Sequence, residues 1–166
     1  MQQEFDEIYR LYAQDVYRFL YGLCRNEALA SDLLQDTMLN AVTSIDQFKG
    51  ECSLKTYLCR IGRNLYFNHL KRAEQRNLPL DETMEAVSDG GEIEEQLADK
   101  MQAAAVHRVL HTLEEPYKEI FSLRVFAELK FSEIGNLFGK TENWARVSFF
   151  RAKEKIIRQL EQEELL

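Results

Sequence analysis

Residues 131–156 read FSEIGNLFGKTENWARVSFFRAKEKI, and this stretch decides the fold of the second half of the chain. Gly135 is a small residue where two helices must approach closely, and Gly139 can adopt the left-handed conformation that ends a helix. Thr141 then offers an N-cap hydroxyl to the next helix. This spacing is typical of a helix-turn-helix, whose second helix enters the major groove of DNA. An ordinary helical hairpin with a solvated charged face has the same spacing, so the motif alone leaves both interpretations open.

The helix that follows Thr141 divides into a buried stripe and a polar face. Ala145, Phe149, Ala152 and Ile156 are spaced four, three and four apart, which predicts one buried stripe. Arg, Asn and Lys on the other faces suit phosphates and base edges, and large apolar residues outside the stripe indicate a contact surface. The candidate DNA-contacting residues here are Thr141, Asn143, Arg146, Val147, Phe150, Arg151 and Lys153.

A second candidate surface lies in the first half, where residues 48–72 read FKGECSLKTYLCRIGRNLYFNHLKR. Residues 49–76 hold seven basic and two acidic side chains, a net charge of +5. Basic residues hold phosphates, while aromatic rings and amides stack on or bond to unpaired bases. A solvated basic face over an aromatic core fits the same pattern. The candidate residues are Lys49, Lys55, Tyr57, Arg60, Arg63, Asn64, Asn68, Lys71 and Arg72.

Apolar spacing predicts an all-α fold of two small domains. Helices are expected over about 5–23, 33–45, 54–76, 106–113 and 132–138. A further helix begins with Pro116 in its first turn, and the last begins at about Glu142. Ser31 and Ser53 are the predicted N-caps of the second and third helices. Residues 77–105 hold eight acidic and one basic side chain, a net charge of −7, with the only Gly-Gly pair and few large apolar residues. Such a segment is typical of a linker. The predicted units are a domain 1–76, an acidic linker 77–105 and a domain 106–166.

Composition limits the class of protein. The 166 residues include 21 Lys and Arg against 28 Asp and Glu, a net charge of −7, and 45% are hydrophobic. No apolar run approaches the roughly 18 residues of a membrane span, and the first ten residues lack the features of a secretory signal. Three cysteines without CxxC spacing argue against a disulfide framework. We therefore expect a soluble cytoplasmic protein that does not insert into a membrane.

Catalytic signatures are weak. His107 and His111 are four positions apart, a spacing that can bind metal, but no third ligand accompanies them, and a surface or interdomain pair is the simpler interpretation. Ser53 lacks a Gly-x-Ser-x-Gly setting, and no phosphate-binding loop is present. We expect no enzyme activity, no metal and no cofactor.

Taken together, these segments resemble bacterial RNA polymerase sigma factors of the extracytoplasmic-function type. The similar stretches are DLLQDTMLNAV (32–42), residues 48–72 and residues 113–156, and they span most of residues 5–160 in two domains. The chain departs from the family at Tyr57, where Trp is frequent, at Asn68, where Asp is frequent, and at residues 146–148, where Lys-Ser-Arg is common.

The resemblance implies partners and residue roles. The acidic stretch would dock on a coiled coil of the largest polymerase subunit through Asp32, Gln35, Asp36 and Leu39. The segment 45–72 would recognise and open the promoter −10 element, with the loop 46–53 capturing a flipped base. The helix after Thr141 would read the −35 element. The implied partners are core RNA polymerase, promoter DNA and an anti-sigma factor.

Two other classes of protein remain open at this point. A stand-alone helix-turn-helix regulator would bind its operator unaided, usually as a dimer. A helical adaptor would use the exposed aromatic residues as a protein interface. Loss of function after substitution of Arg146 and Arg151 would exclude the adaptor.

Overall fold

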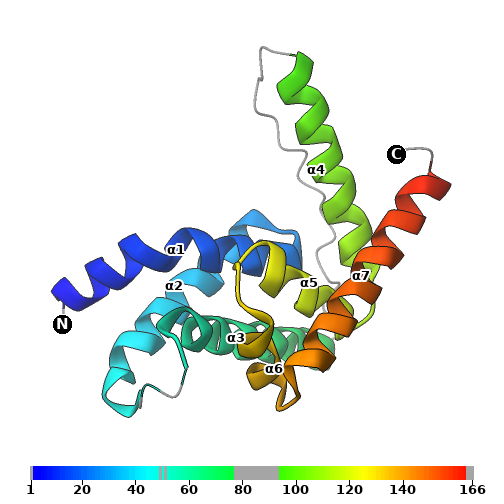
Figure 1. Cartoon of the computed structure of the whole chain (residues 1–166). Helices are drawn as coiled ribbons and strands as arrows, with labels where there is room; N and C mark the ends of the chain where they lie inside the picture. The colour runs from blue at the N-terminus through cyan, green and yellow to red at the C-terminus, as the bar shows by residue number, and fades with distance from the viewer. Residues whose placement is uncertain (1, 49, 51, 77–93, 164–166) are drawn as a thin grey trace.

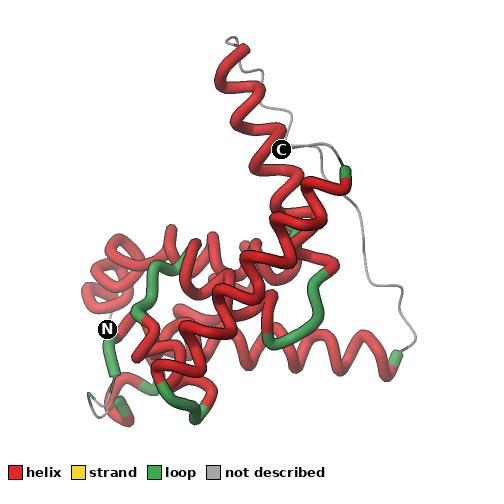
Figure 2. Tube along the Cα trace, turned by 45° about the vertical axis from the view of Figure 1, so that its right-hand side comes forward, coloured by secondary structure: helices red, strands yellow, loops and turns green. Residues whose placement is uncertain are grey.

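The computed structural model describes residues 2–48, 50, 52–76 and 94–163, and every regular element in these ranges is helical. The predicted all-α class is therefore confirmed. Figures 1 and 2 show the arrangement of the helices. In chain order they are α1 (Gln2–Cys24), α2 (Glu27–Thr43), the short 3-10 helix η1 (Ile45–Gln47), α3 (Leu54–Gln75), α4 (Glu94–Thr112), α5 (Tyr117–Val125), α6 (Phe131–Phe138) and α7 (Glu142–Gln162).

Helices α1, α2 and α3 pack together as the first domain. The N-cap predicted at Ser31 is wrong, because α2 already begins at Glu27 and Asn26 caps it by accepting a 3.0 Å hydrogen bond from the Leu29 N–H. Asn26 has the extended backbone that an N-cap needs, whereas Ser31 lies inside the helix. The cap predicted at Ser53 is confirmed by a 3.1 Å bond from the Thr56 N–H to the Ser53 hydroxyl oxygen.

Helices α4 to α7 form the second domain. Helix α4 begins at Glu94, inside the segment 77–105 that was predicted as linker, while residues 77–93 lie outside the described residues. Helix α4 lies against α7 (Figure 1). The core of this domain includes the buried side chains of Val109, Leu110, Ile156 and Leu160.

The two domains are packed against each other. Phe19 and Leu58 of the first domain belong to the same buried cluster as Ile120 and Ile134 of the second. Gly22 on α1 marks a close approach, because a Cβ there would stand 2.8 Å from side-chain atoms of Ser122 and Phe126. A single hydrophobic core therefore crosses the domain boundary.

His107 lies within this boundary. Its ring stacks on Phe126 with centroids 4.9 Å apart and meets the edge of Tyr21 at the same distance. Burial, reinforced by the nearby charges of Arg25 and Arg18 on the first domain, lowers the pKa of His107 to about 4. The imidazole is therefore neutral at pH 7 and contributes to the apolar interface.

Candidate nucleic-acid interface

Helices α6 and α7 form the helix-turn-helix that the sequence predicts. Gly139 has φ +66°, which ends α6 in the left-handed conformation, and the Thr141 hydroxyl accepts a 3.0 Å bond from the Trp144 N–H. A Cβ on Gly135 would lie 2.6 Å from the backbone oxygen of Thr141. Gly135 is therefore required by the close approach of the turn to α6.

Helix α7 presents one buried stripe and one exposed face. Ala145, Ala152 and Ile156 are buried, Phe149 is half-buried, and Ser148 adds a buried position that the spacing missed. Val147 and Phe150 are 39% and 53% exposed, large values for apolar side chains. The exposed candidate residues are Thr141, Asn143, Arg146, Val147, Phe150, Arg151 and Lys153.

An aromatic cluster supports the exposed Phe150 ring. The centroid of Phe149 is 5.6 Å from those of Phe131 and Phe150. The guanidinium carbons of Arg124 and Arg146 lie 4.1 Å and 5.4 Å from the Phe131 centroid. These rings restrict Phe150, and the two cations lie against the neighbouring Phe131 ring. Sequence reasoning missed Phe131 and Arg124, although an aromatic residue at the first position of α6 was a usable signal.

Helix α3 carries an exposed polar face along its second half. Asn64, Asn68, Lys71 and Arg72 are exposed, and Arg60 is partly exposed. Asn64 and Asn68 are one helical turn apart and therefore share a face. Two amides and neighbouring cations are thus available to a nucleic-acid strand along this helix.

Other candidates on α3 contact protein groups instead of solvent. The Lys55 ammonium lies 3.3 Å from Asp15 on α1. Arg63 forms an ion pair with Glu119 on α5. The structure therefore does not bring Lys55 and Arg63 onto the exposed face with the two asparagines, and Lys49 lies outside the described residues.

Tyr57 supports the segment that precedes α3. Its hydroxyl is 2.6 Å from the Ser44 hydroxyl, and its ring centroid is 4.9 Å from that of Phe48. The Tyr57 ring is half-buried. It therefore packs against the two residues that flank η1 instead of standing free in solvent.

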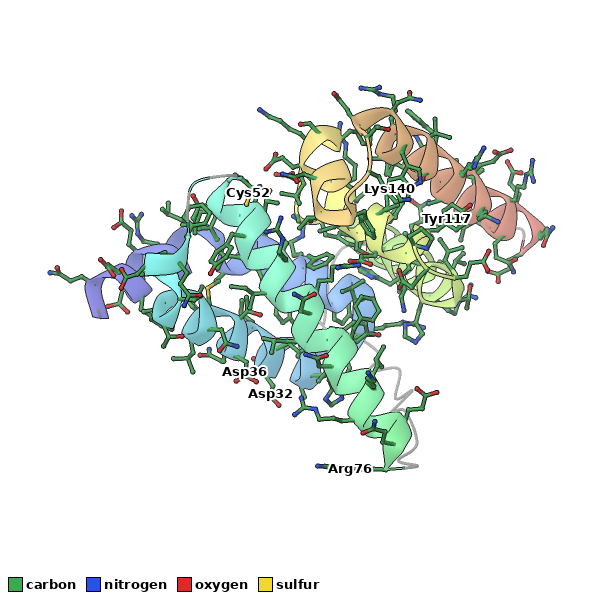
Figure 3. All side chains as sticks on the ribbon, turned by 90° about the horizontal axis from the view of Figure 1, so that it is seen from below. Asp32, Asp36, Cys52, Arg76, Tyr117 and Lys140 are labelled. Atoms are coloured by element: carbon green, nitrogen blue, oxygen red, sulfur yellow. The ribbon has the colours of Figure 1, made fainter. Side chains whose placement is uncertain are left out.

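The acidic candidates lie together on α2. Asp32, Gln35, Asp36 and Leu39 are all exposed, and Leu39 is 55% exposed. The residues between them on the opposite side of the helix are buried, namely Leu33, Leu34, Thr37 and Met38. Figure 3 shows Asp32 and Asp36 pointing outward from α2, on the side away from Lys140 and Tyr117 of the second domain. This face is open to a partner while the two domains remain packed.

Two family descriptions match the chain, sigma-70 region 2 over residues 8–76 and sigma-70 region 4 over residues 103–156. The first contains α2 and α3, and the second contains the helix-turn-helix. The chain belongs to the sigma-70 family. Sigma factors bind core RNA polymerase and direct it to specific promoters, and the stand-alone regulator is not favoured.

Known relatives place this sigma factor in the extracytoplasmic-function type. It is 28% identical over 152 residues to the RNA polymerase sigma factor SigV of Bacillus subtilis, and this alignment covers 92% of this chain and 88% of SigV. It is 26% identical over 155 residues to the extracytoplasmic-function sigma factor SigM of the same organism, covering 91% of each.

Solved structures share the fold. The sigma factor RpoE, in complex with the anti-sigma factor NepR from Bartonella quintana, matches with a TM-score of 0.76 and 19% identity over 96% of this chain and 98% of RpoE. CnrH in complex with the cytosolic domain of CnrY matches with a TM-score of 0.65 and 18% identity, over 98% of this chain and 90% of CnrH.

Two negative findings apply to the described part of the sigma factor. No helix in it has the length and apolar character needed to cross a membrane. It also holds no group of three or more His, Cys, Asp or Glu side chains that could bind a metal ion.

Proposed function

We propose that this sigma factor docks on core RNA polymerase through the acidic face of α2, holds the opened −10 element along α3 and reads the −35 element with α7. The observation that carries the proposal is the exposure of three chemically different helix faces, one acidic and two rich in basic and amide groups. The polymerase supplies the chemistry, and the sigma factor, which acts in the cytoplasm beside it, supplies no catalytic group.

The face of α2 suits a basic partner with an apolar centre. The Asp32 and Asp36 carboxylates are exposed on the same side of the helix, and Leu39 adds an apolar side chain one turn further on. Complementary charges steer association and fix its orientation, while a buried Leu adds affinity. This face remains uncovered when the two domains pack together.

Helix α3 suits a separated DNA strand. Asn64 and Asn68 offer donors and acceptors to base edges, and Lys71 and Arg72 lie further along the same helix to hold phosphates. The Tyr57 and Phe48 rings form an aromatic wall at its start. Unstacking a base costs a few kcal/mol, and capture of the flipped base against aromatic rings offsets this cost.

Helix α7 suits the major groove of a duplex. Arg146 and Arg151 are exposed and can contact phosphates or guanine edges. Val147 and Phe150 are apolar and can pack against the methyl groups of thymine. We therefore expect a −35 element that contains thymine at the positions opposite these two residues.

We also propose that an anti-sigma factor binds this chain. RpoE was solved in complex with the anti-sigma factor NepR and CnrH in complex with the cytosolic domain of CnrY, and both match nearly the whole of this chain. A protein that contacts both domains at once would keep them together and away from the promoter.

The test is run-off transcription with purified bacterial core polymerase, a promoter library and this chain as the sole specificity factor. We expect specific transcripts that require both proteins and that disappear with Arg146→Ala/Arg151→Ala. The control Arg158→Ala removes an exposed arginine from the same helix, outside the helix-turn-helix, and should keep the transcripts. Tight unaided binding to one DNA site without specific transcripts would refute the proposal and favour a stand-alone regulator.

A further inference from the structure

Arg146, a candidate DNA-contacting residue of α7, lies between two side chains that the proposed function does not use. Its Nη2 atom donates a 3.1 Å hydrogen bond to the carboxylate of Glu142, one turn earlier on the same helix. Its guanidinium carbon lies 5.4 Å from the ring centroid of Phe131, the first residue of α6. Arg146 is therefore held from both helices of the helix-turn-helix, and we call Glu142 and Phe131 the Arg146 clamp.

The Phe131 ring is a firm support because it belongs to a row of aromatic rings. Its centroid lies 5.6 Å from that of Phe149, which in turn stacks on Phe121 at 5.8 Å. Phe121 is buried in the core of the second domain. A shift of the Phe131 ring would therefore disturb the packing of the core beneath it.

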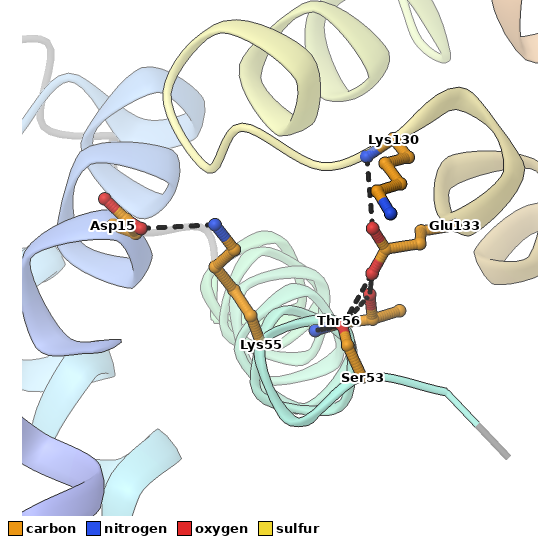
Figure 4. Close-up of polar contacts among 6 residues, drawn as sticks. All are labelled: Asp15, Ser53, Lys55, Thr56, Lys130 and Glu133. Carbon is orange, nitrogen blue, oxygen red and sulfur yellow. Dashed lines mark hydrogen bonds and ion pairs between the residues drawn. The ribbon is translucent and has the colours of Figure 1, made fainter. Parts of the chain in front are cut away.

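The backbone that carries Phe131 is fixed as well. The Glu133 carboxylate accepts a 3.2 Å bond from the N–H of Lys130, the residue directly before Phe131. Its other oxygen accepts bonds of 2.5 Å from the hydroxyls of Ser53 and Thr56 on α3 (Figure 4). These bonds anchor the first turn of α6, so the position of the Phe131 ring beside α7 is set in the absence of DNA.

The guanidinium of Arg146 remains available while the clamp holds it. The side chain of Arg146 is 45% exposed, and the bond to Glu142 uses one of the five N–H donors of a guanidinium. An edge of the planar group with two parallel donors is therefore left for a ligand. Guanine is the base whose major-groove edge offers two acceptors, N7 and O6, that match this edge.

The charge of Glu142 favours a base over a phosphate as the partner of Arg146. The Glu142 side chain is itself 56% exposed, and its carboxylate lies 3.1 Å from the guanidinium. A phosphate on the same guanidinium would bring two anions together, and their repulsion would lower its affinity. The edge of a guanine carries no net charge and avoids this repulsion.

Holding the side chain in advance also raises selectivity. A free arginine loses conformational freedom when it meets its correct base, and this loss weakens the contact by about two- to twelvefold. A free arginine can also turn to a phosphate beside any base and gain affinity without regard to sequence. A clamped Arg146 avoids both losses, because its orientation is already set.

We infer that Phe131 and Glu142 are positioning residues of the −35 reader, which hold Arg146 for the major-groove edge of a guanine. The inference rests on the proposed assignment of α7 to the −35 element. It adds that this element contains a G·C pair opposite Arg146. It also adds that two residues outside the predicted DNA contacts determine how strongly this pair is selected.

The test measures base preference at every position of the −35 element. The holoenzyme, formed from bacterial core polymerase and this chain, is bound to a promoter library with a randomised −35 region, and the bound DNA is sequenced. The wild-type chain should prefer guanine at one position by about 5- to 150-fold, the range of a bidentate arginine contact. Arg146→Ala should abolish the preference at that position and thereby locate it.

Two variants remove the clamp from opposite sides. Phe131→Leu and Glu142→Gln should each reduce the guanine preference at the Arg146 position about threefold and leave the other positions unchanged. Phe131→Tyr keeps the ring and should keep the preference. An exposed ion pair adds little to stability, so urea unfolding of Glu142→Gln should match that of the wild type.

Matched controls remove the same kinds of contact further along α7. Glu154→Gln breaks the ion pair with Arg158, which has the same four-residue spacing and a distance of 2.6 Å. Tyr117→Leu removes the ring whose centroid lies 5.2 Å from the Lys155 ammonium. Both controls should keep the base preferences of the wild type.

An undiminished guanine preference in Phe131→Leu or in Glu142→Gln would overturn the positioning role of that residue. A uniform loss of preference across the −35 element, seen also in the controls, would overturn this role too and indicate a structural one. If Arg146→Ala left every preference unchanged, the proposed reading of the −35 element by Arg146 would be refuted together with the clamp. That result is distinguishable from failure of the clamp alone, in which Arg146→Ala still changes the preference.

Discussion

Replacement of Gly22 by alanine should destabilise this chain, although alanine is the better helix former. In an isolated helix the change would stabilise by about 0.5–1 kcal/mol. Here the new Cβ would stand 2.8 Å from two ring carbons of Phe126 and from the Ser122 oxygen, well inside van der Waals contact. The ring is stacked on His107, and Ser122 donates a 2.8 Å bond to the Lys118 carbonyl, so neither neighbour moves freely.

Overpacking of this kind costs about 1–3 kcal/mol. The cost exceeds the helical gain, and Gly22→Ala should lower the free energy of unfolding by about 1–2 kcal/mol. The assay is urea unfolding of the full chain, followed by circular dichroism and by the fluorescence of Trp144, the one tryptophan in the sequence.

A matched control is Gly62→Ala, which also adds a methyl group inside a helix. Its Cβ would stand 3.2 Å from side-chain atoms of Leu20 and Thr37, both within the first domain. Strain and helical gain should nearly cancel there. If Gly22→Ala instead raised the free energy of unfolding by the full helical gain, the rigid contact between α1 and α5 would be refuted.

Three further predictions concern the interface and α7. Protonation of His107, whose pKa is lowered by burial to about 4 in the folded chain against an ordinary 6.5, favours unfolding. The contribution of His107 to the free energy of unfolding should be complete above pH 7 and decrease as pH falls from 6.5 towards 4; a pH profile of urea unfolding that is the same in His107→Leu would contradict this. Phe150→Ala should reduce selection of thymine in the −35 element, which binding-site selection checks; because the ring is 53% exposed, the accompanying loss of stability should be small. Thr141→Ala should lower the free energy of unfolding by about 1 kcal/mol through loss of the bond to the Trp144 N–H, measured by urea unfolding.

Local features of the protein were predictable from its sequence. The four-three-four spacing of Ala145, Phe149, Ala152 and Ile156 predicted the buried side of α7 because a helix repeats every 3.6 residues. Gly139 and Thr141 marked the turn because left-handed backbone and N-capping each require particular residue types. The cap at Ser31 was wrong because Asn26, five residues earlier, offers an equivalent capping side chain and α2 begins directly after it.

The tertiary structure decided which candidate residues are available. Ser53 and Glu133 are 80 positions apart, and no periodicity along the chain relates them. Lys55 and Arg63 belong to the same basic pattern as Lys71 and Arg72, yet the first two are paired with acidic groups of other helices and the last two are exposed. Sequence spacing fixes the face of a helix on which a side chain lies, but the element packed against that face determines whether the side chain meets solvent, DNA or a buried carboxylate.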